Sequence, residues 1–272
     1  MPPIERRLKG DYMTGETIAI VTGASGGLGR EFVKLLSMKN GIDKIWAIAR
    51  SEDKLTKIQS EFGEKIQTIP MDLSDRNSYN MLKRLLNESS VNVKYLVNCA
   101  GFAKFCSYND ISLEESLNMI DLNVNAVVAI GLICIPHMKE GSHIINLASQ
   151  ASFFPLPYQN IYSSTKAFIR NYTRALNVEL RSKGIHTTAV CPGFIKTGLL
   201  DRAVIGAKKG TNNFLGMVTP DVVAVKALKD ADKGKDISIY GLYVKLTHLL
   251  SKIMPQKIMM KIWCVQQKIR QE

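Results

Sequence analysis

A strand-like run, a glycine-rich turn and a helical pattern follow one another without a break near the start of the chain. Residues 17–21 (TIAIV) are apolar and mostly β-branched, as in a buried parallel strand, and residues 22–29 (TGASGGLG) follow at once. Apolar residues then recur at helical spacing from Phe32 to Met38, and Asn40-Gly41 ends the pattern. A glycine motif binds a dinucleotide in this context, so the succession indicates an α/β chain with a nucleotide site.

Three glycines of the turn have separate expected roles. Gly23 permits the tight turn after the strand, and Gly27 lets backbone N–H groups approach a pyrophosphate. Gly29 lets the helix pack close to the strand. The helix N-terminus adds partial positive charge beside the phosphates.

The alternation of strands and helices continues along the chain, with no long-period repeat and no low-complexity linker. We therefore expect an α/β fold: a single doubly wound parallel sheet (Rossmann fold) with helices on both faces. Ser51 and Ser74 are the expected N-caps of two helices, and Thr219 with Pro220 at the first helical position begins another. The expected strands are residues 17–21, 44–49, 65–70, 93–98, 142–147, 185–190 and 236–240.

Arg50 follows the second expected strand. An NAD-binding protein usually carries an acid at the end of this strand for the ribose 2′-hydroxyl. An arginine there can instead pair with a 2′-phosphate through two hydrogen bonds, or it simply begins a loop. The sequence therefore favours NADP(H), with NAD(H) as the alternative.

Tyr162 and Lys166 are four residues apart in an expected helix over residues 161–181, so they share one face. An ammonium beside a phenol favours the phenolate and is expected to lower the tyrosine pKa, which suits general acid–base catalysis. Ser149, at the end of a preceding strand, would offer its hydroxyl to the same reacting oxygen. The pair could also be an ordinary exposed helix pair, but the other motifs also follow strands, where doubly wound sheets bind ligands.

These motifs resemble those of the short-chain dehydrogenase/reductase family in its single-domain form, over about residues 17–240. They are Thr22-Gly23-xxx-Gly27-x-Gly29, Asn98-x-Ala100-Gly101, Asn123, Ser149, Tyr162-xxx-Lys166 and Pro192-Gly193. The resemblance implies that Tyr162 is the acid/base, Ser149 holds the substrate oxygen and Lys166 tunes Tyr162 and binds the nicotinamide ribose. It also implies that Asn123 anchors a proton-relay water. Asn123 lies in DLNVN (residues 121–125), which interrupts a long expected helix and predicts a kink or a site.

The resemblance also implies a set of cofactor contacts, with Asp72 at the adenine and Ile195 and Thr197 at the carboxamide. The expected set is Gly23, Ser25, Gly27, Leu28, Gly29, Arg50, Asp72, Leu73, Asn98, Ala100, Gly101, Tyr162, Lys166, Pro192, Gly193, Ile195 and Thr197. Two positions depart from the family pattern. Cys99 replaces the usual Asn, and Ala148 replaces the Ser that often precedes the catalytic Ser.

Composition limits the other classes of function. The 272 residues are 46% hydrophobic and carry a net charge of +12, with Lys and Arg spread along the chain and no nucleic-acid motif. A solvated basic surface or attraction of a phosphate-bearing cofactor explains this charge. Five scattered cysteines and four histidines show no metal-ligand spacing, so we expect no metal, structural histidines and a reduced, cytoplasmic compartment. The polar N-terminus lacks a signal-peptide pattern, and no unbroken apolar run approaches membrane-spanning length.

Three parts are expected: an N-terminal segment (1–15), an oxidoreductase domain (16–240) with a mobile lid at about 194–217, and a C-terminal amphipathic helical extension (241–272). Pro255 should divide the extension into two helices. Apolar and basic residues alternate in it, so it can pack on the core or a partner subunit, close over a pocket, or lie on a membrane surface. Similar extensions occur in the hydroxysteroid- and acyl-reducing branches of the family. A homodimer or homotetramer is expected.

Apolar residues near the expected site predict a bulky hydrophobic substrate of the steroid, bile-acid or fatty-chain type. The expected reaction is therefore NADP(H)-dependent interconversion of a carbonyl and a secondary alcohol. The alternatives are a general short-chain ketone reductase and a non-catalytic NADP-binding regulator on the same fold. The apolar residues are Phe102, Phe105, Phe153, Phe154, Leu156, Phe194, Leu199, Leu200, Phe214 and Leu215.

Overall fold

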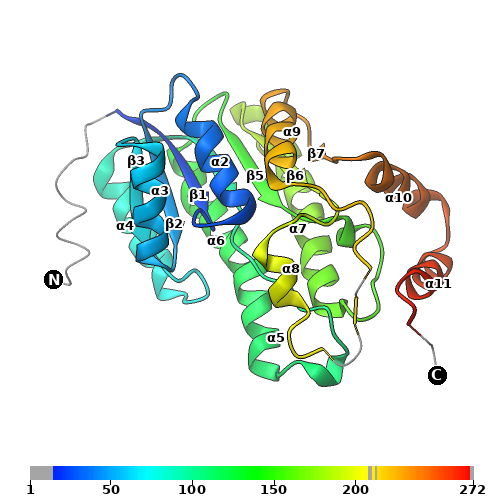
Figure 1. Cartoon of the computed structure of the whole chain (residues 1–272). Coiled ribbons are helices and arrows are strands. Elements are labelled where there is room, and N and C mark those ends of the chain that lie inside the picture. The colour runs from blue at the N-terminus through cyan, green and yellow to red at the C-terminus, as the bar shows by residue number, and fades with distance from the viewer. Residues whose placement is uncertain (1–14, 208–209, 212, 270–272) are drawn as a thin grey trace.

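A seven-stranded parallel sheet forms the centre of the computed structural model, which describes residues 15–207, 210–211 and 213–269. The strand order is β3-β2-β1-β4-β5-β6-β7, so the α/β prediction is confirmed (Figure 1). The expected N-terminal segment lies outside the described residues except for Gly15. The strands are β1 (Thr17–Thr22), β2 (Lys44–Ala49), β3 (Ile66–Pro70), β4 (Asn92–Asn98), β5 (His143–Leu147), β6 (His186–Val190) and β7 (Ile237–Ser238).

Strand β1 shows how the sequence builds two cores. Its side chains alternate between the sheet faces, so Ala19 and Val21 join one buried cluster while Ile18 and Ile20 join the other. Helices α2 (Gly27–Ser37), α3 (Glu52–Phe62) and α9 (Pro220–Asp232) cover the first face. Helices α4 (Asn77–Ser89), α6 (Ala126–Cys134) and α7 (Asn160–Glu179) cover the second.

The helix starts match the sequence in two of three expected places. Ser51 caps α3 by accepting from the Lys54 N–H, and Thr219 stands at the N-cap of α9 with Pro220 following. Ser74 is not a cap, because α4 begins later, after Arg76. The N–H and hydroxyl of Ser74 both donate to Asp72 Oδ1, at 3.0 and 2.7 Å, which closes a turn instead.

The long helix before β5 is interrupted where the sequence predicts. Helix α5 (Leu113–Ile120) passes into a π-helical turn, Asp121–Asn125, and then into α6. The Ala126 N–H bonds to the Asp121 carbonyl, five residues back, so one extra residue is inserted at Asn123.

The stretch from α5 to the turn after α6, Leu113–His137, has the length and apolar composition of a membrane span, within the part of the chain that the structure describes. The stretch meets these criteria by average hydropathy, whereas polar residues such as Asp121 and Asn123 interrupt it, so no unbroken apolar run reaches this length. In the fold, Ala126, Ile130 and Cys134 of this stretch are buried in the core beneath the sheet. A core helix meets the same criteria of length and composition.

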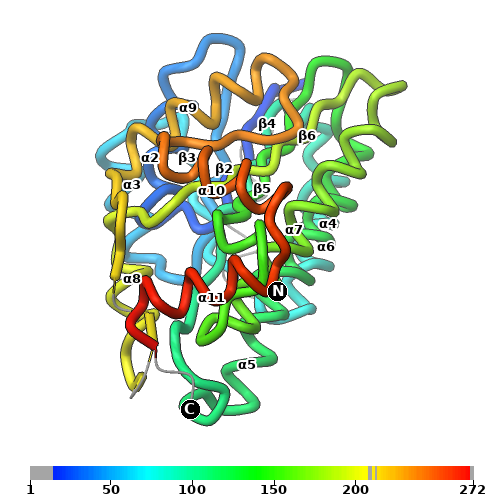
Figure 2. Tube along the Cα trace, turned by 90° about the vertical axis from the view of Figure 1, so that its right-hand side faces the viewer, coloured from blue at the N-terminus to red at the C-terminus, as the bar shows by residue number. Residues whose placement is uncertain are grey.

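The C-terminal extension forms two helices, α10 (Leu242–Ile253) and α11 (Gln256–Gln266), divided at Pro255 as expected. Both lie on the same side of the molecule (Figure 2). Val244 of α10 is buried with Phe153 and Cys191, while Trp263 and Cys264 of α11 are buried beside the pocket described below. One face of the extension is therefore part of the core.

Candidate active site

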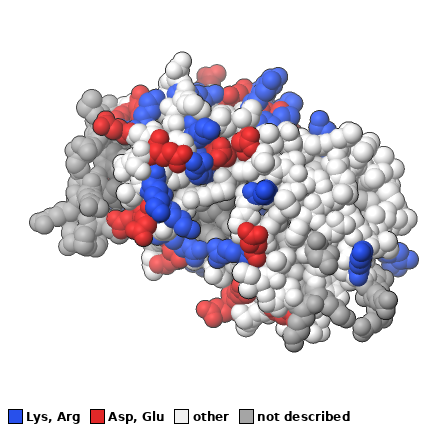
Figure 3. Space-filling model, in the orientation of Figure 1, with Lys and Arg blue, Asp and Glu red and all other residues white. Residues whose placement is uncertain are grey.

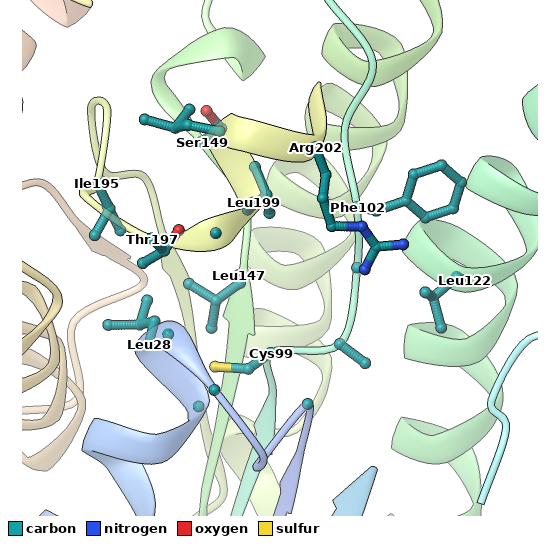
Figure 4. Close-up of a pocket in the computed structure, with 18 of the residues that line it drawn as sticks. Leu28, Cys99, Phe102, Leu122, Leu147, Ser149, Ile195, Thr197, Leu199 and Arg202 are labelled. Carbon is teal, nitrogen blue, oxygen red and sulfur yellow. The ribbon is translucent and has the colours of Figure 1, made fainter. Parts of the chain in front are cut away.

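A cavity of about 580 Å³ opens at the carboxyl ends of the strands. It lies where neighbouring β1 and β4 lead to crossovers on opposite sides, the switch point at which doubly wound sheets bind ligands. The glycine turn, the ends of β4 and β5, and α8 (Gly198–Ala203) all contribute to its walls (Figure 4). Every expected cofactor or catalytic residue lines it except Asn98 and Asn123.

The glycine turn is too tight for side chains. A Cβ on Gly29 would lie 2.2 Å from the Gly23 carbonyl oxygen, and one on Gly23 would lie 2.9 Å from the Ala100 nitrogen. Gly23 and Gly27 both have positive φ, at 64° and 52°. No side chain caps the start of α2 and its first turn holds no acid, so its N–H groups are available to an anion. This turn fits a pyrophosphate.

Basic and hydroxyl side chains gather at the end of the cavity beside β2. Ser25, Arg50, Ser51 and Lys54 all line it. The Arg50 guanidinium is more than half exposed and lies 4.0 Å from Asp72, so it is held only loosely. Burial opposes ionisation of Asp72, but bonds from Ser74 and the charge of Arg50 leave the pKa of that carboxyl below its usual value. This group of donors fits a phosphate ester on a ribose.

Tyr162 and Ser149 meet at the centre of the cavity wall. The Ser149 side chain lies close enough to the Tyr162 hydroxyl to affect its pKa, and it accepts from the Ala151 N–H at 3.1 Å. Burial raises the pKa of Tyr162 to about 12, and Ser149 opposes this rise. The expected lowering of this pKa is therefore wrong for the protein alone, and Tyr162 keeps its proton at neutral pH. A phenol that keeps its proton here can act as an acid.

Lys166 is buried one helical turn beyond Tyr162. Its Nζ donates to the Leu147 carbonyl at 2.8 Å and lies 5.7 Å from the centre of the Tyr162 ring. The ammonium therefore faces the end of β5 and the tyrosine ring. Burial, rather than the charge of Lys166, sets the direction of the Tyr162 pKa shift. Burial lowers the pKa of Lys166 to about 8, with the Cys99 and Cys191 sulfurs acting in the opposite direction.

Asn123 is fully buried behind the cavity rather than in its wall. Its amide nitrogen donates to the Phe102 carbonyl (2.9 Å) and to Thr165 Oγ1 (3.2 Å), and its oxygen accepts from the Phe102 N–H (3.0 Å). The side chain thus fixes the loop after β4 against α7. These hydrogen bonds already occupy the side-chain amide, so a proton-relay water would have to bind a group of Asn123 outside that amide.

The Asn98 side chain also lies outside the cavity. Its amide nitrogen donates to Asn146 Oδ1 at 2.9 Å, and Asn146 in turn donates to Thr173 Oγ1. Asn98 therefore joins β4 to β5 and α7 from beneath the site. Its side chain therefore supports the site from outside the cavity, and the expected contact of Asn98 with a cofactor stays a prediction.

The other end of the cavity is apolar. Phe105 stands edge-on to the Tyr162 ring at 5.5 Å, and Phe194 stands edge-on to Phe105 at 6.5 Å. Of the ten apolar residues expected around a substrate, six line the cavity and four do not. Phe153 packs on His248, Phe214 backs Phe194, and Leu215 is half exposed. The six that line the cavity are Phe102, Phe105, Leu156, Phe194, Leu199 and Leu200; Phe154 is the fourth that does not.

Several polar and aromatic residues of the cavity wall were missed by sequence reasoning, among them Lys54, Gln150, Gln159, Arg202 and Trp263. Lys54 is one turn along the helix that Ser51 caps, and Gln150 follows Ser149, so both could have been found by proximity to the motifs. Trp263 is 114 positions after Ser149, and no local pattern places it. The Arg202 side chain extends from α8 toward the loop of Phe102 (Figure 4).

The histidines stand apart from this site. His143 stacks between Tyr95 and His186, at 5.0 and 5.7 Å, at the starts of β5 and β6. Among the described residues, no three His, Cys, Asp or Glu side chains lie together as a metal site would require. The five cysteines are free thiols, and four of them are buried.

Comparison with known proteins bears on the class of this site. Residues 17–206 match the family model for short chain dehydrogenases. A very-long-chain 3-oxoacyl-CoA reductase of Macaca fascicularis is 30% identical over 254 residues, which cover 90% of this chain and 77% of that protein. An uncharacterized oxidoreductase of Staphylococcus epidermidis is 28% identical over 196 residues, covering 71% of this chain and 84% of the other.

Two solved structures have the same fold. A short-chain dehydrogenase from Sphingobium yanoikuyae in complex with NADPH has a TM-score of 0.74 at 24% identity, covering 90% of this chain and 95% of the other. A serine dehydrogenase complexed with NADP⁺ has a TM-score of 0.70 at 26% identity, covering 82% and 94%. The chain belongs to the short-chain dehydrogenase family, and it is an oxidoreductase.

Proposed function

We propose that this protein uses NADP(H) to interconvert a carbonyl and a secondary alcohol on a bulky, fatty-chain substrate. The observation that carries the proposal is the position of the buried Tyr162 and Ser149 side chains in the cavity wall. They lie between the glycine turn, which fits a pyrophosphate, and the apolar chamber that forms the other end of the same cavity. A cofactor bound on one side of Tyr162 and a substrate bound on the other would then meet beside its hydroxyl. Asn123, Ser149, Tyr162 and Lys166 form the proposed catalytic group.

The cavity residues suit NADP(H) in three places. The turn from Gly23 to Gly29 would hold the pyrophosphate, and Asp72 would lie at the adenosine. Arg50, with Lys54 beside it, would take a 2′-phosphate through charge-assisted hydrogen bonds. When bound, the nicotinamide supplies the hydride that reduces the carbonyl carbon. The NADPH and NADP⁺ complexes of the two structural relatives support this choice.

The chain's own residues would handle the oxygen and its proton. The Ser149 and Tyr162 side chains both line the cavity, where each hydroxyl would donate a hydrogen bond to the substrate carbonyl oxygen. The Tyr162 O–H then breaks as its proton passes to that oxygen, which becomes the alcohol. Because burial keeps Tyr162 protonated at neutral pH, the protein alone is prepared for the reducing direction. Lys166 fixes the end of β5 beside the ring.

The apolar chamber supports a large substrate. Phe105, Phe194, Leu156 and Trp263 enclose it, and each buried CH₂ group contributes roughly 0.8 kcal/mol. A chain or ring system of several carbons would therefore bind better than a small polar carbonyl. The relative that acts on very-long-chain 3-oxoacyl-CoA supports a fatty-chain carbonyl ahead of a steroid or bile acid.

A panel of carbonyl compounds tests the substrate class. NADPH oxidation is measured with 3-oxoacyl thioesters and ketones of increasing chain length, a keto-steroid, a keto bile acid and a three-carbon ketone. The kcat/KM should rise at least tenfold from the shortest to the longest chain. A three-carbon ketone turned over as well as the best substrate would indicate a general ketone reductase. NADPH binding without turnover of any compound would instead support a non-catalytic regulator.

We also propose that the protein is a homodimer or homotetramer. Apolar side chains are exposed along α5, α6 and α7, where Leu117, Leu132 and Phe168 are each about half accessible. Self-association would remove such side chains from water. Sedimentation velocity gives the assembly directly.

A further inference from the structure

Helix α10 turns an apolar stripe toward solvent. Five large side chains, spaced by four, three, one and three residues, fall along one side of the helix, and each is at least 44% exposed. The opposite side is anchored by Val244, which is 3% exposed. The helix is therefore apolar on both sides, and only one side has a partner in the fold. The exposed residues are Leu242, Leu246, Leu249, Leu250 and Ile253.

Helix α11 repeats the arrangement. Ile258, Ile262 and Val265 lie at i, i+4 and i+7 and are 44%, 47% and 78% exposed. The opposite side holds Trp263, whose Nε1–H donates to the Pro157 carbonyl at 3.1 Å, and Gln267, which exchanges two hydrogen bonds with the Asn213 backbone. The helix is thus fixed to the body by its inner side, and its outer stripe cannot turn inward.

Lysines border both stripes. Between residues 237 and 269 the chain has five lysines and no Asp or Glu. On α10, Lys245 and Lys252 lie along one edge of the stripe, and on α11 Lys257 and Lys261 do the same, because i+7 and i+4 spacings share a face. Lys268 follows just after the end of α11. All five are exposed. In Figure 3 the end of the molecule that carries these helices has blue atoms and no red ones, whereas both colours mix over α2 and α3.

We propose that α10 and α11 form a docking face for a lipid bilayer with anionic headgroups. A solvent-facing apolar stripe edged by lysines has the pattern of a helix that lies in the membrane interface, with apolar side chains among acyl chains and ammonium groups at the headgroups. A second copy of the chain fits less well. Two such faces would bring lysines against lysines, with no carboxylate on either to pair them.

The docking face adjoins the cavity. Trp263 lines the cavity from the inner side of α11, while Ile262 and Val265 on the same helix face outward. Only the thickness of one helix separates a docked bilayer from the apolar chamber. A docked bilayer would therefore lie close to the part of the cavity that would take an apolar substrate. The docking itself needs neither cofactor nor turnover, so its test is independent of the proposed reaction.

Vesicle flotation tests the docking face. The full chain, without substrate or cofactor, is mixed with vesicles of phosphatidylcholine alone or with 30% phosphatidylglycerol, a composition chosen as the probe. We expect binding to the anionic vesicles that weakens as salt rises. Lys252→Glu/Lys261→Glu and Leu246→Ser/Ile262→Ser should each lower the partition coefficient at least tenfold. Lys57→Glu/Lys83→Glu, on α3 and α4, and Val225→Ser, on α9, are the matched controls and should bind as the parent does.

Failure of the parent to bind anionic vesicles would overturn the proposal, as would equal loss of binding in the control variants. Sedimentation velocity without lipid addresses the competing occupant. If Leu246→Ser/Ile262→Ser converts an oligomer into monomers and the parent does not float with vesicles, the stripes form a contact between copies. Circular dichroism melting of each variant checks that the exposed substitutions leave the fold intact.

Discussion

The Tyr162 hydroxyl is the group on which the proposed chemistry depends, and its ring stands edge-on to Phe105 in the cavity wall. Tyr162→Phe keeps the ring and its edge-on contact and removes only the proton donor. We expect kcat to fall at least a hundredfold, because general acid–base catalysis contributes about 10²–10⁴-fold. NADPH affinity should stay nearly unchanged. Steady-state kinetics and a fluorescence titration with NADPH measure the two quantities.

Tyr172 provides the control for this substitution. It lies on the same helix, α7, and its buried hydroxyl has no hydrogen-bond partner. Tyr172→Phe should leave kcat within about twofold of the parent, because it removes a hydroxyl that contacts no reacting group. If Tyr162→Phe retains more than roughly a tenth of the activity, the acid is another group.

Lys166 predicts a pH dependence. Burial lowers its pKa from an ordinary 10.5 to about 8, so its charge is lost as the pH rises through 8 in the folded protein. The kcat/KM for carbonyl reduction should therefore be flat at neutral pH and fall above about pH 8, since the neutral amine no longer orders the end of β5 and the Tyr162 ring as the ammonium does. The residual activity of Lys166→Met should not show this fall in kcat/KM above about pH 8. A fall that persists in that variant would come from the titration of a different group.

The same pKa shift affects stability with a definite sign. Between pH 8 and 10.5 the unfolded chain binds the Lys166 proton more tightly than the folded one. Folding stability from this residue is therefore fully present above pH 10.5 and is lost as the pH falls through 8. A buried ammonium thus costs stability at neutral pH, which is common for groups retained for catalysis.

At the level of elements, α11 sets the depth of the apolar chamber through Trp263. Trp263→Ala should raise KM for the longest-chain substrates at least tenfold and leave a three-carbon ketone unaffected, because only a long chain reaches the indole. Val265→Ala, on the exposed side of the same helix, is the matched control. A uniform loss for all chain lengths would mean that Trp263 supports the fold rather than the substrate. Trp263→Phe, with a milder packing change, distinguishes these outcomes further.

Local sequence signals predicted the elements that depend on local physics. The glycine turn, the Ser51 cap and the interruption at Asn123 all follow from backbone conformation or from neighbouring residues. Ser74 was assigned wrongly because its hydroxyl can either accept from the N–H groups of a helix start or donate to Asp72, and the turn to Asp72 prevails. Cap chemistry alone cannot decide between them.

Contacts between distant segments were not predictable. The position of Trp263 over the cavity depends on two contacts of α11 with distant segments. Trp263 bonds to Pro157, 106 residues away, and Gln267 bonds to Asn213, 54 residues away. The high pKa of Tyr162 has the same origin, because desolvation depends on what surrounds the ring and not on Lys166 four residues away. The residues of the site could be chosen from sequence, but the balance of burial and charge on them could not.

At the scale of the whole molecule, the cavity joins the two halves of the sheet. Its walls come from the glycine turn and Arg50 on the β1–β2 side, and from Ser149 and Pro192 after β5 and β6 on the other. A ligand that contacts both halves binds the folded chain and not the unfolded one, so it should raise the melting temperature. This links cofactor choice to a measurement on the intact protein.

NADPH should stabilise the protein more than NADH does, because Lys54 and Arg50, which is held only loosely by Asp72, both line the cavity and can pair with a 2′-phosphate. A ligand at a hundred times its Kd adds about 2.7 kcal/mol, which corresponds to a rise of roughly 5–10 °C for a protein of this size. Arg50→Asp should reverse the order by removing a two-bond donor and adding repulsion. Lys57→Asp, exposed on the same helix as Lys54 but outside the cavity, should keep it. Equal thermal shifts and equal turnover with NADPH and NADH would show that Arg50 and Lys54 do not recognise the 2′-phosphate.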